Sequence, residues 1–599
     1  MDKEDKKTER SHSDWLLLKT LAQYLLVCRR QGVVALVTII TGSLLDVVGP
    51  LILREIIDNY VLAGKTEGLL TLGVVYLAVF LFIGVTVYVR LWMLSEMGHT
   101  ALYRLRRDTF EHLQTLDLGF YSTQPAGEIM ARCTNDIDRL ETVLSGEVLN
   151  ALASLLMISV MLGVMFTISP LLTVISLLVF PLVIAAALLN RHYERPLWRR
   201  WNNMNGKVVS FMQEHIAGVR VSHAYTRRKR NEAEFEDLTQ EFYRKEMKAV
   251  TATGLIWPFS SDMVAVVGTA LIIFFGGNLV LTGTTGVTAG ALVLFLSYQA
   301  KFLRPVFTLS SLYSQLQTAF SSMERILSLL ETTSQTPEKS DPIDLQLVHG
   351  TVEFRNVSFS YVPDKPVLEE FSLTIAPRET VAIVGETGAG KTTVTRLIPR
   401  FYDVPLDKGA VLIDGQDIRT VGLDSLRRKI GFVLQDPFLF SGTVRENLTY
   451  GKDIADNELM DILEMVGASF VHDLVDGLDT EVGERGSQLS MGQRQLISLA
   501  RALVVNPQII LMDEATSSVD PMAELQIQSV MQHLLSDRTA VIVAHRLSTV
   551  RDSDRIVVLD KGRVIEDGSY TDLMEKQGHF YTLYQTQFRM QEKMGLSVV

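Results

Sequence analysis

The segment at residues 385–393, Gly-Glu-Thr-Gly-Ala-Gly-Lys-Thr-Thr, has the residue types and spacing of a phosphate-binding loop. It matches G-x-x-x-x-G-K-[ST] and follows the apolar run 381–384, and we expect a helix from Thr392 to about Arg400. Glycines let main-chain N–H groups surround a phosphate at a helix N-terminus. We expect Lys391 to place its charge on the β- and γ-phosphates of a nucleotide and Thr392 to ligate Mg²⁺. The predicted nucleotide-binding residues here are Gly385, Glu386, Thr387, Gly388, Ala389, Gly390, Lys391, Thr392 and Thr393.

A second chemical element is the apolar run 509–512, which ends in the two carboxylates Asp513 and Glu514. A buried strand that delivers Asp513 beside the phosphates would place this side chain to organise Mg²⁺. Glu514 would then be positioned to polarise the attacking water. Strands often end in acidic turns, so this pattern gains its meaning from the phosphate-binding loop that precedes it.

These residues need a scaffold, and after about residue 332 the sequence predicts an α/β domain. Short β-rich runs alternate with helical ones, which indicates a mostly parallel sheet. The predicted strands are 352–354, 380–384, 430–434, 509–512, 540–544 and 556–559. The polar segment 332–342, which contains two prolines, is expected to be a linker.

The first half of the chain is typical of a membrane protein. Mean hydropathy over all 599 residues is +0.20. In a soluble protein of this length, the polar residues of the water-facing surface would bring the mean below zero. Residues 148–190 and 263–300 contain no Asp, Glu, Lys or Arg, and each run is long enough for two spans. With further spans at 33–53 and 69–91, we predict six transmembrane helices. The net charge of −11 argues against nucleic-acid binding, and two cysteines cannot build a disulfide framework.

The distribution of basic residues predicts the orientation of these spans. Arginines and lysines gather in the long loops at about 95–146 and 191–248, so we expect both loops to face the cytoplasm, as do both termini. The loops are also expected to continue the spans as helices, for example over 101–116. The amphipathic segment 15–27 is too short to cross the bilayer and would lie along its surface. No cleavable signal peptide is evident.

Together these motifs resemble those of an ATP-binding-cassette (ABC) exporter half-transporter, with its membrane domain first and one ATPase domain after it. Six motifs follow in the family's order. They are Tyr361, the phosphate-binding loop, Gln435 in Val-Leu-Gln-Asp-Pro (433–437), Leu-Ser-Met-Gly-Gln (489–493), Ser-Ser-Val-Asp (517–520), and His545. The segment 481–486 also resembles a loop that in such exporters touches the intracellular loops. The resemblance implies a fold with a six-helix membrane domain followed by an α/β P-loop ATPase domain.

The resemblance also implies a role for each motif residue. Tyr361 would stack on adenine, Gln435 would reach Mg²⁺, and His545 would stabilise the γ-phosphate. The signature residues Ser490, Gly492 and Gln493, with Asp520, would contribute to nucleotide binding across a dimer. The implied catalytic residues are Glu514, His545 and Gln435, the implied metal ligands are Thr392, Gln435 and Asp513, and the cofactors are ATP and Mg²⁺.

The signature motif departs from the family pattern, because Met491 stands where the family has glycine. This puts a bulky side chain where the backbone should approach a nucleotide closely. An altered signature beside an intact Glu514 resembles the competent subunit of a heterodimeric exporter, although a homodimer that tolerates Met491 stays open.

The expected function is ATP-driven export of small amphipathic solutes, drugs or lipids, across a bacterial inner membrane by alternating access, with a second half-transporter as partner. A homodimeric lipid flippase, a peptide exporter and an ATP-gated channel or regulatory subunit are the alternatives. The expected domains are a tail at 1–12, a membrane domain at 13–331, a linker at 332–347, an ATPase domain at 348–590 and a tail at 591–599.

Overall fold

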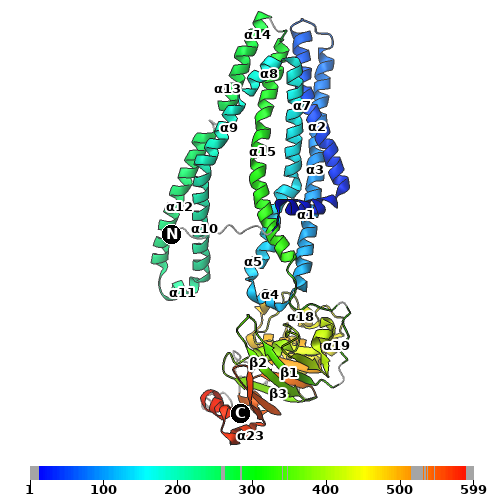
Figure 1. Cartoon of the computed structure of the whole chain (residues 1–599), viewed down its shortest axis with the longest axis vertical. Helices are drawn as coiled ribbons and strands as arrows, with labels where there is room; N and C mark the ends of the chain where they lie inside the picture. The colour runs from blue at the N-terminus through cyan, green and yellow to red at the C-terminus, as the bar shows by residue number, and fades with distance from the viewer. Residues whose placement is uncertain are drawn as a thin grey trace. The chain divides into compact units, whose positions relative to one another are not determined.

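The computed structural model describes residues 12–257, 263–283, 286–339, 341–346, 349–513, 530–531, 535, 537–544 and 547–588. The chain forms two compact units (Figure 1). The first contains Met1–Leu113 and Gly127–Glu331, and the second contains Gln114–Ala126 and Thr332–Val599. A short segment of the first half of the chain therefore belongs to the unit formed by the second half.

The first unit is built from helices over its described residues. They are α1 (Asp14–Leu26), α2 (Arg29–Ile56), α3 (Leu69–Thr115), α5 (Ala126–Ala131), α6 (Ile137–Thr142), α7 (Val148–Ile168), α8 (Pro170–Leu177), α9 (Phe180–Leu189), α10 (Arg195–Ala217), α11 (Val219–Ala224), α12 (Arg228–Trp257), α13 (Met263–Leu271), α14 (Gly277–Thr282) and α15 (Ala289–Leu330). The helix α4 (Leu118–Thr123) and the end of α3 belong to the second unit. Ser169 explains the break between α7 and α8, because it caps α8 while Pro170 fills the first turn.

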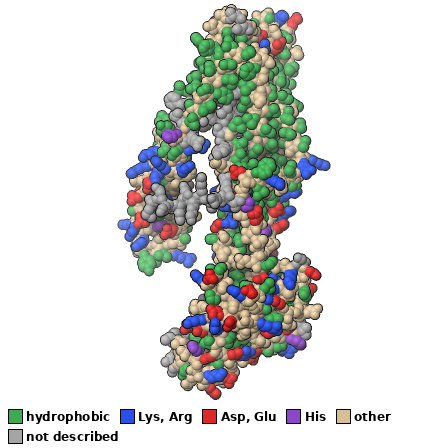
Figure 2. Space-filling model, in the orientation of Figure 1, with side chains coloured by type: hydrophobic (Ala, Val, Ile, Leu, Met, Phe, Trp, Pro, Cys, Tyr) green, Lys and Arg blue, Asp and Glu red, His purple; other side chains and the backbone are tan. Residues whose placement is uncertain are grey.

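Helices occupy all the regions where spans were predicted. Within the described part of the chain, four helical segments are long and apolar enough to cross a membrane: Arg29–Val61, Leu69–Thr115, Ala126–Ile168 and Met263–Thr282. The apolar segment Pro170–Ala185 is shorter, and α15 begins in the remaining charge-free stretch. Figure 2 shows hydrophobic side chains covering the helices of this region, with charged side chains gathered on the α10–α12 hairpin.

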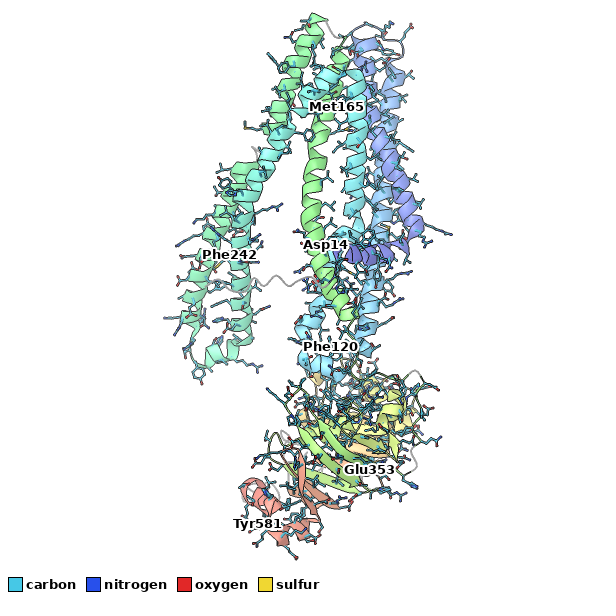
Figure 3. All side chains as sticks on the ribbon, viewed as in Figure 1. Asp14, Phe120, Met165, Phe242, Glu353 and Tyr581 are labelled. Carbon is cyan, nitrogen blue, oxygen red and sulfur yellow. The ribbon has the colours of Figure 1, made fainter. Side chains whose placement is uncertain are left out.

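Several of these helices are longer than a bilayer is thick. The 47 residues of α3 correspond to about 70 Å, against about 30 Å of hydrocarbon. The predicted helical continuation over 101–116 is therefore present as part of α3. An apolar core packs the spans together, and it includes Met165 on α7, Val47 on α2 and Tyr298 on α15 (Figure 3).

The second unit contains two sheets. A six-stranded sheet has the order β10-β9-β3-β8-β7-β6, in which all neighbours are parallel except β10 and β9. A four-stranded antiparallel sheet has the order β2-β1-β4-β5. The strands are β1 (Val352–Phe359), β2 (Leu368–Ile375), β3 (Thr380–Gly385), β4 (Ala410–Ile413), β5 (Gln416–Asp417), β6 (Ile430–Val433), β7 (Ile509–Asp513), β8 (Thr539–Val543), β9 (Arg555–Asp560) and β10 (Arg563–Gly568).

Each predicted strand corresponds to a strand in the structure, but β1 pairs in the antiparallel sheet and not in the parallel one. The strands β2, β4, β5 and β10 were not predicted. Described helices of this unit are α16 (Lys391–Leu397), α17 (Leu423–Arg427), α18 (Val444–Thr449), α19 (Asp456–Met465), α20 (Met491–Val504), α22 (Leu547–Arg551), α23 (Tyr570–Lys576) and α24 (His579–Leu583). Two apolar cores stabilise the unit, one on each side of the parallel sheet's buried central strands.

Candidate nucleotide-binding site

Three predicted parts of the site, the phosphate-binding loop, Asp513 and Gln435, lie at one edge of the parallel sheet. The central strands β3, β8, β7 and β6 are neighbours, and parallel strands end at the same edge. The phosphate-binding loop follows β3, Asp513 ends β7, and Gln435 lies two residues after β6. Because β7 pairs with both β6 and β8, Asp513 at the end of β7 lies between these two strands.

Two glycines of the loop have conformations or surroundings that exclude a side chain. A Cβ at Gly385 would lie 2.3 Å from the carbonyl oxygen of Leu559. Gly390 has a φ of +102°, and its Cβ would lie 3.0 Å from the carbonyl oxygen of Val367. Beyond the loop, α16 begins at Lys391, as the motif predicts. Glu386, Thr387 and Gly388 are exposed, whereas Ala389, Gly390 and Thr393 are buried.

Lys391 is buried at the mouth of this loop. Its ammonium group donates hydrogen bonds to the carbonyl oxygens of Gly385 at 2.8 Å and Glu386 at 3.0 Å. These two carbonyl partners orient the ammonium group at the mouth of the loop. A phosphate held by the loop would meet this charge directly.

The hydroxyl of Thr392 donates a hydrogen bond to Asp513 Oδ1 across 3.3 Å. A hydroxyl and a carboxylate oxygen are the hard donors that Mg²⁺ prefers, and they come from two different elements, α16 and β7. The predicted metal ligands Thr392 and Asp513 are thus brought together by the fold. The pair fits Mg²⁺ in its donor chemistry, with Gln435 on the neighbouring segment.

Tyr361 lies beside the same helix. Its hydroxyl donates to Thr393 Oγ1 at 3.1 Å, and 40% of the residue is exposed, which leaves ring surface available for stacking. The ring also meets Phe359 and Tyr402 edge-on, with centroid distances of 5.0 and 4.9 Å. The predicted adenine-stacking residue is therefore fixed to the phosphate-binding helix at its hydroxyl end.

The signature motif forms the start of α20. Ser490 caps this helix and accepts a hydrogen bond from the Gln493 N–H at 3.2 Å, while Gln493 Oε1 accepts one from the Ser490 N–H at 2.9 Å. Gly492 is buried, and the Sδ atom of Met491 accepts a hydrogen bond from the guanidinium of Arg494 at 3.4 Å. The helix N-terminus that would face a γ-phosphate is therefore present despite Met491.

Arg501, which the sequence analysis did not single out, joins the signature helix to the segment that carries Gln435. It donates to the carbonyl oxygens of Phe438 at 2.8 Å and Asn447 at 2.7 Å, and its guanidinium lies 5.0 Å from the ring centre of Tyr450. Because these acceptors are main-chain atoms, no sequence pattern signals them. Of the other predicted residues, Glu514, Asp520 and His545 lie outside the described residues.

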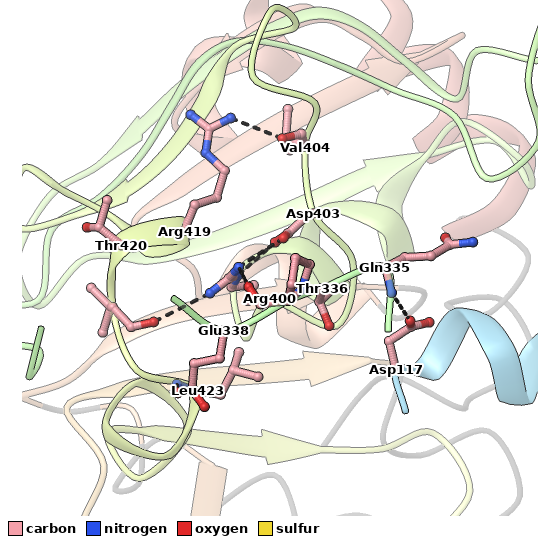
Figure 4. Close-up of polar contacts among 12 residues, drawn as sticks. Asp117, Gln335, Thr336, Glu338, Arg400, Asp403, Val404, Arg419, Thr420 and Leu423 are labelled. Carbon is pink, nitrogen blue, oxygen red and sulfur yellow. Dashed lines mark hydrogen bonds and ion pairs between the residues drawn. The ribbon is translucent and has the colours of Figure 1, made fainter. Parts of the chain in front are cut away.

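Within the second unit, a further network joins the linker to α4 and to the segment after α16 (Figure 4). The carboxylate of Asp117 caps α4 through the Phe120 N–H at 3.0 Å and accepts hydrogen bonds from Ser334 and the Gln335 N–H. Arg400 is buried, pairs with Asp403 at 2.7 Å and donates to the carbonyl oxygen of Pro337 at 3.0 Å. The linker is thus hydrogen-bonded to Asp117 before α4 and to Arg400 after α16.

Comparison with known proteins agrees with this geometry. Residues 33–306 match the family model described as "ABC transporter transmembrane region", and residues 368–517 match the model described as "ABC transporter". Over 579 residues the chain is 36% identical to the "Uncharacterized ABC transporter ATP-binding protein YknV" of Bacillus subtilis (strain 168), covering 96% of this chain and 94% of that protein. The chain belongs to the ABC transporter family.

Two further similarities identify the branch of the family as the exporters. The exporter chain is 34% identical over 575 residues to the "ATP-dependent lipid A-core flippase" of Syntrophus aciditrophicus (strain SB), covering 95% of this chain and 94% of that protein. A solved structure of a bacterial Atm1-family ABC exporter with ATP bound matches with a TM-score of 0.76 and 29% identity, over 94% of this chain and 98% of that one. This ABC exporter is a multi-pass membrane protein that couples ATP hydrolysis to transport.

Proposed function

We propose that this chain is half of a dimeric exporter that moves amphipathic lipids or drugs out of the cell. The Thr392–Asp513 pair beside the buried Lys391 carries the proposal, since it joins the phosphate-binding and metal-binding elements at one sheet edge. The apolar helices of the first unit supply the transport path. The proposed membrane domain is 13–331 and the proposed ATPase domain is 348–590.

The hydrolytic roles follow from the chemistry of each side chain. Lys391 exchanges its carbonyl partners for phosphate oxygens when ATP enters, and Tyr361 stacks on adenine. When bound, Mg²⁺ neutralises phosphate charge, with Thr392, Asp513 and Gln435 as its protein ligands. Glu514 polarises the attacking water and His545 stabilises the γ-phosphate. ATP then joins two ATPase domains, and hydrolysis releases them, which alternates the access of the membrane cavity.

The partner that we favour is a different half-transporter. Met491 gives this chain a modified signature, and its own Lys391 and Glu514 would use the signature of the partner. That partner would carry Leu-Ser-Gly-Gly-Gln and lack the carboxylate that Glu514 supplies here. A homodimeric lipid flippase is the second candidate, and the similarity to a lipid A-core flippase favours it.

We further propose that the exporter resides in a bacterial inner membrane, with both termini and the ATPase domain in the cytoplasm. The basic residues of the long loops support this orientation. No nucleic acid is expected as a partner, because the net charge is −11.

Transport into inverted membrane vesicles tests the proposal. Vesicles that contain the exporter should accumulate a fluorescent amphiphile against its gradient only with ATP, whereas vesicles with Glu514→Gln should not. Flux that merely follows the gradient in either direction after ATP addition would contradict export and indicate an ATP-gated channel. Purification of the chain alone tests the partnership, since a stable homodimer with substrate-stimulated hydrolysis would contradict the heterodimer.

A further inference from the structure

Three ionisable side chains from three different helices interact within the membrane domain. They are Asp46 on α2, Arg90 on α3 and Lys301 on α15. The ammonium of Lys301 lies 2.9 Å from Asp46 Oδ1 and 3.0 Å from the carbonyl oxygen of Asp46. Ionisable groups inside a membrane are costly, and they commonly mark a transport pathway.

Arg90 lies on α3, the helix that packs beside α2. A Cβ at Gly42 would contact the side chain of Thr86, and one at Gly49 would contact the side chain of Tyr76. Residue numbers therefore rise along α2 as they fall along α3, so the two helices run antiparallel. Side chains lean toward the N-terminus of their own helix, and in antiparallel helices this tilts Asp46 and Arg90 toward each other. The Nε of Arg90 is buried and has no hydrogen-bond partner among the described residues.

The charges of this cluster do not balance. Two cations share one carboxylate, and Lys301 already holds one of its oxygens. Among the described residues, the guanidinium of Arg90, whose donors suit a carboxylate or phosphate, has no ion pair of its own. Asp46 and Lys301 have side chains 35% and 36% exposed, so these two members of the cluster are accessible to a ligand.

The surrounding contacts hold the helices that carry the cluster. The hydroxyl of Tyr298, one turn from Lys301, donates to the carbonyl oxygen of Val47 at 2.8 Å. The same two helices also meet where α15 begins. There Asp58, on the continuation of α2, accepts hydrogen bonds from the Thr288 hydroxyl at 2.5 Å and the Gly290 N–H at 2.8 Å. The contacts between α2 and α15 thus fix the two helices next to Asp46 and again near residue 58, which preorganises Lys301.

We propose that Arg90 and Lys301 bind the anionic headgroup, a carboxylate or a phosphate, of an amphiphile that the exporter moves. Asp46 occupies Lys301 until the headgroup arrives and competes with it for the two cations. This inference rests on the proposed export function and narrows its substrate class to anionic amphiphiles.

The test uses the exporter purified from its membrane with any partner half-transporter and reconstituted into vesicles. Fluorescent phosphatidylglycerol, a fluorescent fatty acid and phosphatidylcholine with the same label serve as probes of phosphate, carboxylate and zwitterionic headgroups. The readout is the ATP-dependent translocation of each anionic probe divided by that of phosphatidylcholine in the same preparation. This ratio removes any general loss of folded protein.

The unmodified exporter should favour at least one anionic probe, and the anionic probe that it favours reveals whether the headgroup is a carboxylate or a phosphate. Arg90→Gln and Lys301→Gln should each lower the ratio by about tenfold, and Arg90→Lys should lower it less because the charge is kept. Asp46→Asn should raise the ratio, because it removes the competing anion. Lys65→Gln, at an exposed turn between α2 and α3, is the matched control and should leave the ratio unchanged.

An unchanged ratio in both Arg90→Gln and Lys301→Gln would overturn the inference, as would a preference of the unmodified exporter for phosphatidylcholine. In both cases ATP-driven transport would persist, so the proposed function would stand. Failure of the unmodified exporter to move any probe or any drug with ATP would instead contradict the proposed function.

Discussion

The ring of Tyr402 meets the ring of Tyr361 edge-on, with their centroids 4.9 Å apart. Tyr402 also lies beside α4, because a Cβ at Gly119 would be 3.5 Å from its ring. Tyr361 in turn is hydrogen-bonded to Thr393 on the phosphate-binding helix. A short series of contacts therefore joins a helix from the first half of the chain to the proposed adenine site.

We expect Tyr402→Leu to weaken ATP binding, because Tyr361 loses an edge-on partner whose contact is worth about 0.5–1.5 kcal/mol. The ATP concentration for half-maximal hydrolysis should rise by about threefold, which a titration of hydrolysis against ATP measures. Tyr402→Phe keeps the ring and serves as the control. Equal ATP dependence in the leucine and phenylalanine variants would show that the ring contact does not position Tyr361.

The catalytic carboxylate and the phosphate-binding lysine should differ in their effects. Glu514→Gln should lower the rate of hydrolysis by about 10²–10⁴-fold while ATP still binds, since it removes only a catalytic group. Lys391→Ala should weaken ATP binding itself, because a charge on the phosphates is lost. Nucleotide binding and turnover are measured on the same preparations. Normal ATP affinity in Lys391→Ala, or normal turnover in Glu514→Gln, would refute the respective role.

Asp117 should couple transport to hydrolysis. Asp117→Ala removes the cap of α4, worth about 1 kcal/mol, together with the hydrogen bonds to the linker at Ser334 and Gln335. We expect ATP hydrolysis to continue but its stimulation by transported substrate to fall. Ser122→Ala, which removes an exposed hydroxyl bonded only within α4, is the matched control. Full substrate stimulation in Asp117→Ala would contradict this role.

The ion pair between Asp136 and Arg325 should make stability depend on pH. Burial alone would raise the pKa of Asp136, but the hydrogen bonds and charge of Arg325 outweigh it and hold the pKa below its usual range. Because the folded-state pKa is lowered, the stabilisation is complete above the usual aspartate pKa of about 3.9 and is lost as the pH falls below it.

Thermal unfolding of the unmodified exporter and Asp136→Asn measures this effect. At pH 7 the variant should be about 1–2 kcal/mol less stable, a value between those of exposed and buried pairs because Arg325 is partly exposed. The difference should shrink progressively below pH 4. Asp138→Asn is the control, since Asp138 pairs with Arg106 in an exposed position. A difference that is independent of pH would exclude the ion pair as its cause.

Met491→Gly distinguishes the two forms of dimer. In a heterodimer the repaired signature faces the site of the partner, which lacks a catalytic glutamate, so hydrolysis should change only modestly. In a homodimer both sites gain a glycine signature, and hydrolysis should rise clearly. Steady-state hydrolysis by the complex purified from its native membrane separates these outcomes.

The motif spacing predicted the site where residues act through their own chemistry. Lys391, Thr392 and Asp513 could be found because a phosphate-binding loop and an acidic strand end have fixed residue types. The links of Arg400 to the linker and of Arg501 to the segment after β6 could not, because these bonds go to main-chain oxygens, which any residue supplies. Antiparallel strands such as β2 and β10 were also missed, since their half-exposed polar residues resemble those of loops.

Because Gln114–Ala126 belongs to the second unit, the chain passes between the two units three times, at residues 113–114, 126–127 and 331–332. A protease that cut the linker near Lys339 would sever only the last of these passages. The fragments should then stay together under native conditions and separate only in denaturant, as two bands on an electrophoresis gel. A single flexible linker would let each unit rotate independently. Three chain connections restrict this rotation, so a rotation of one unit acts on the other through the backbone.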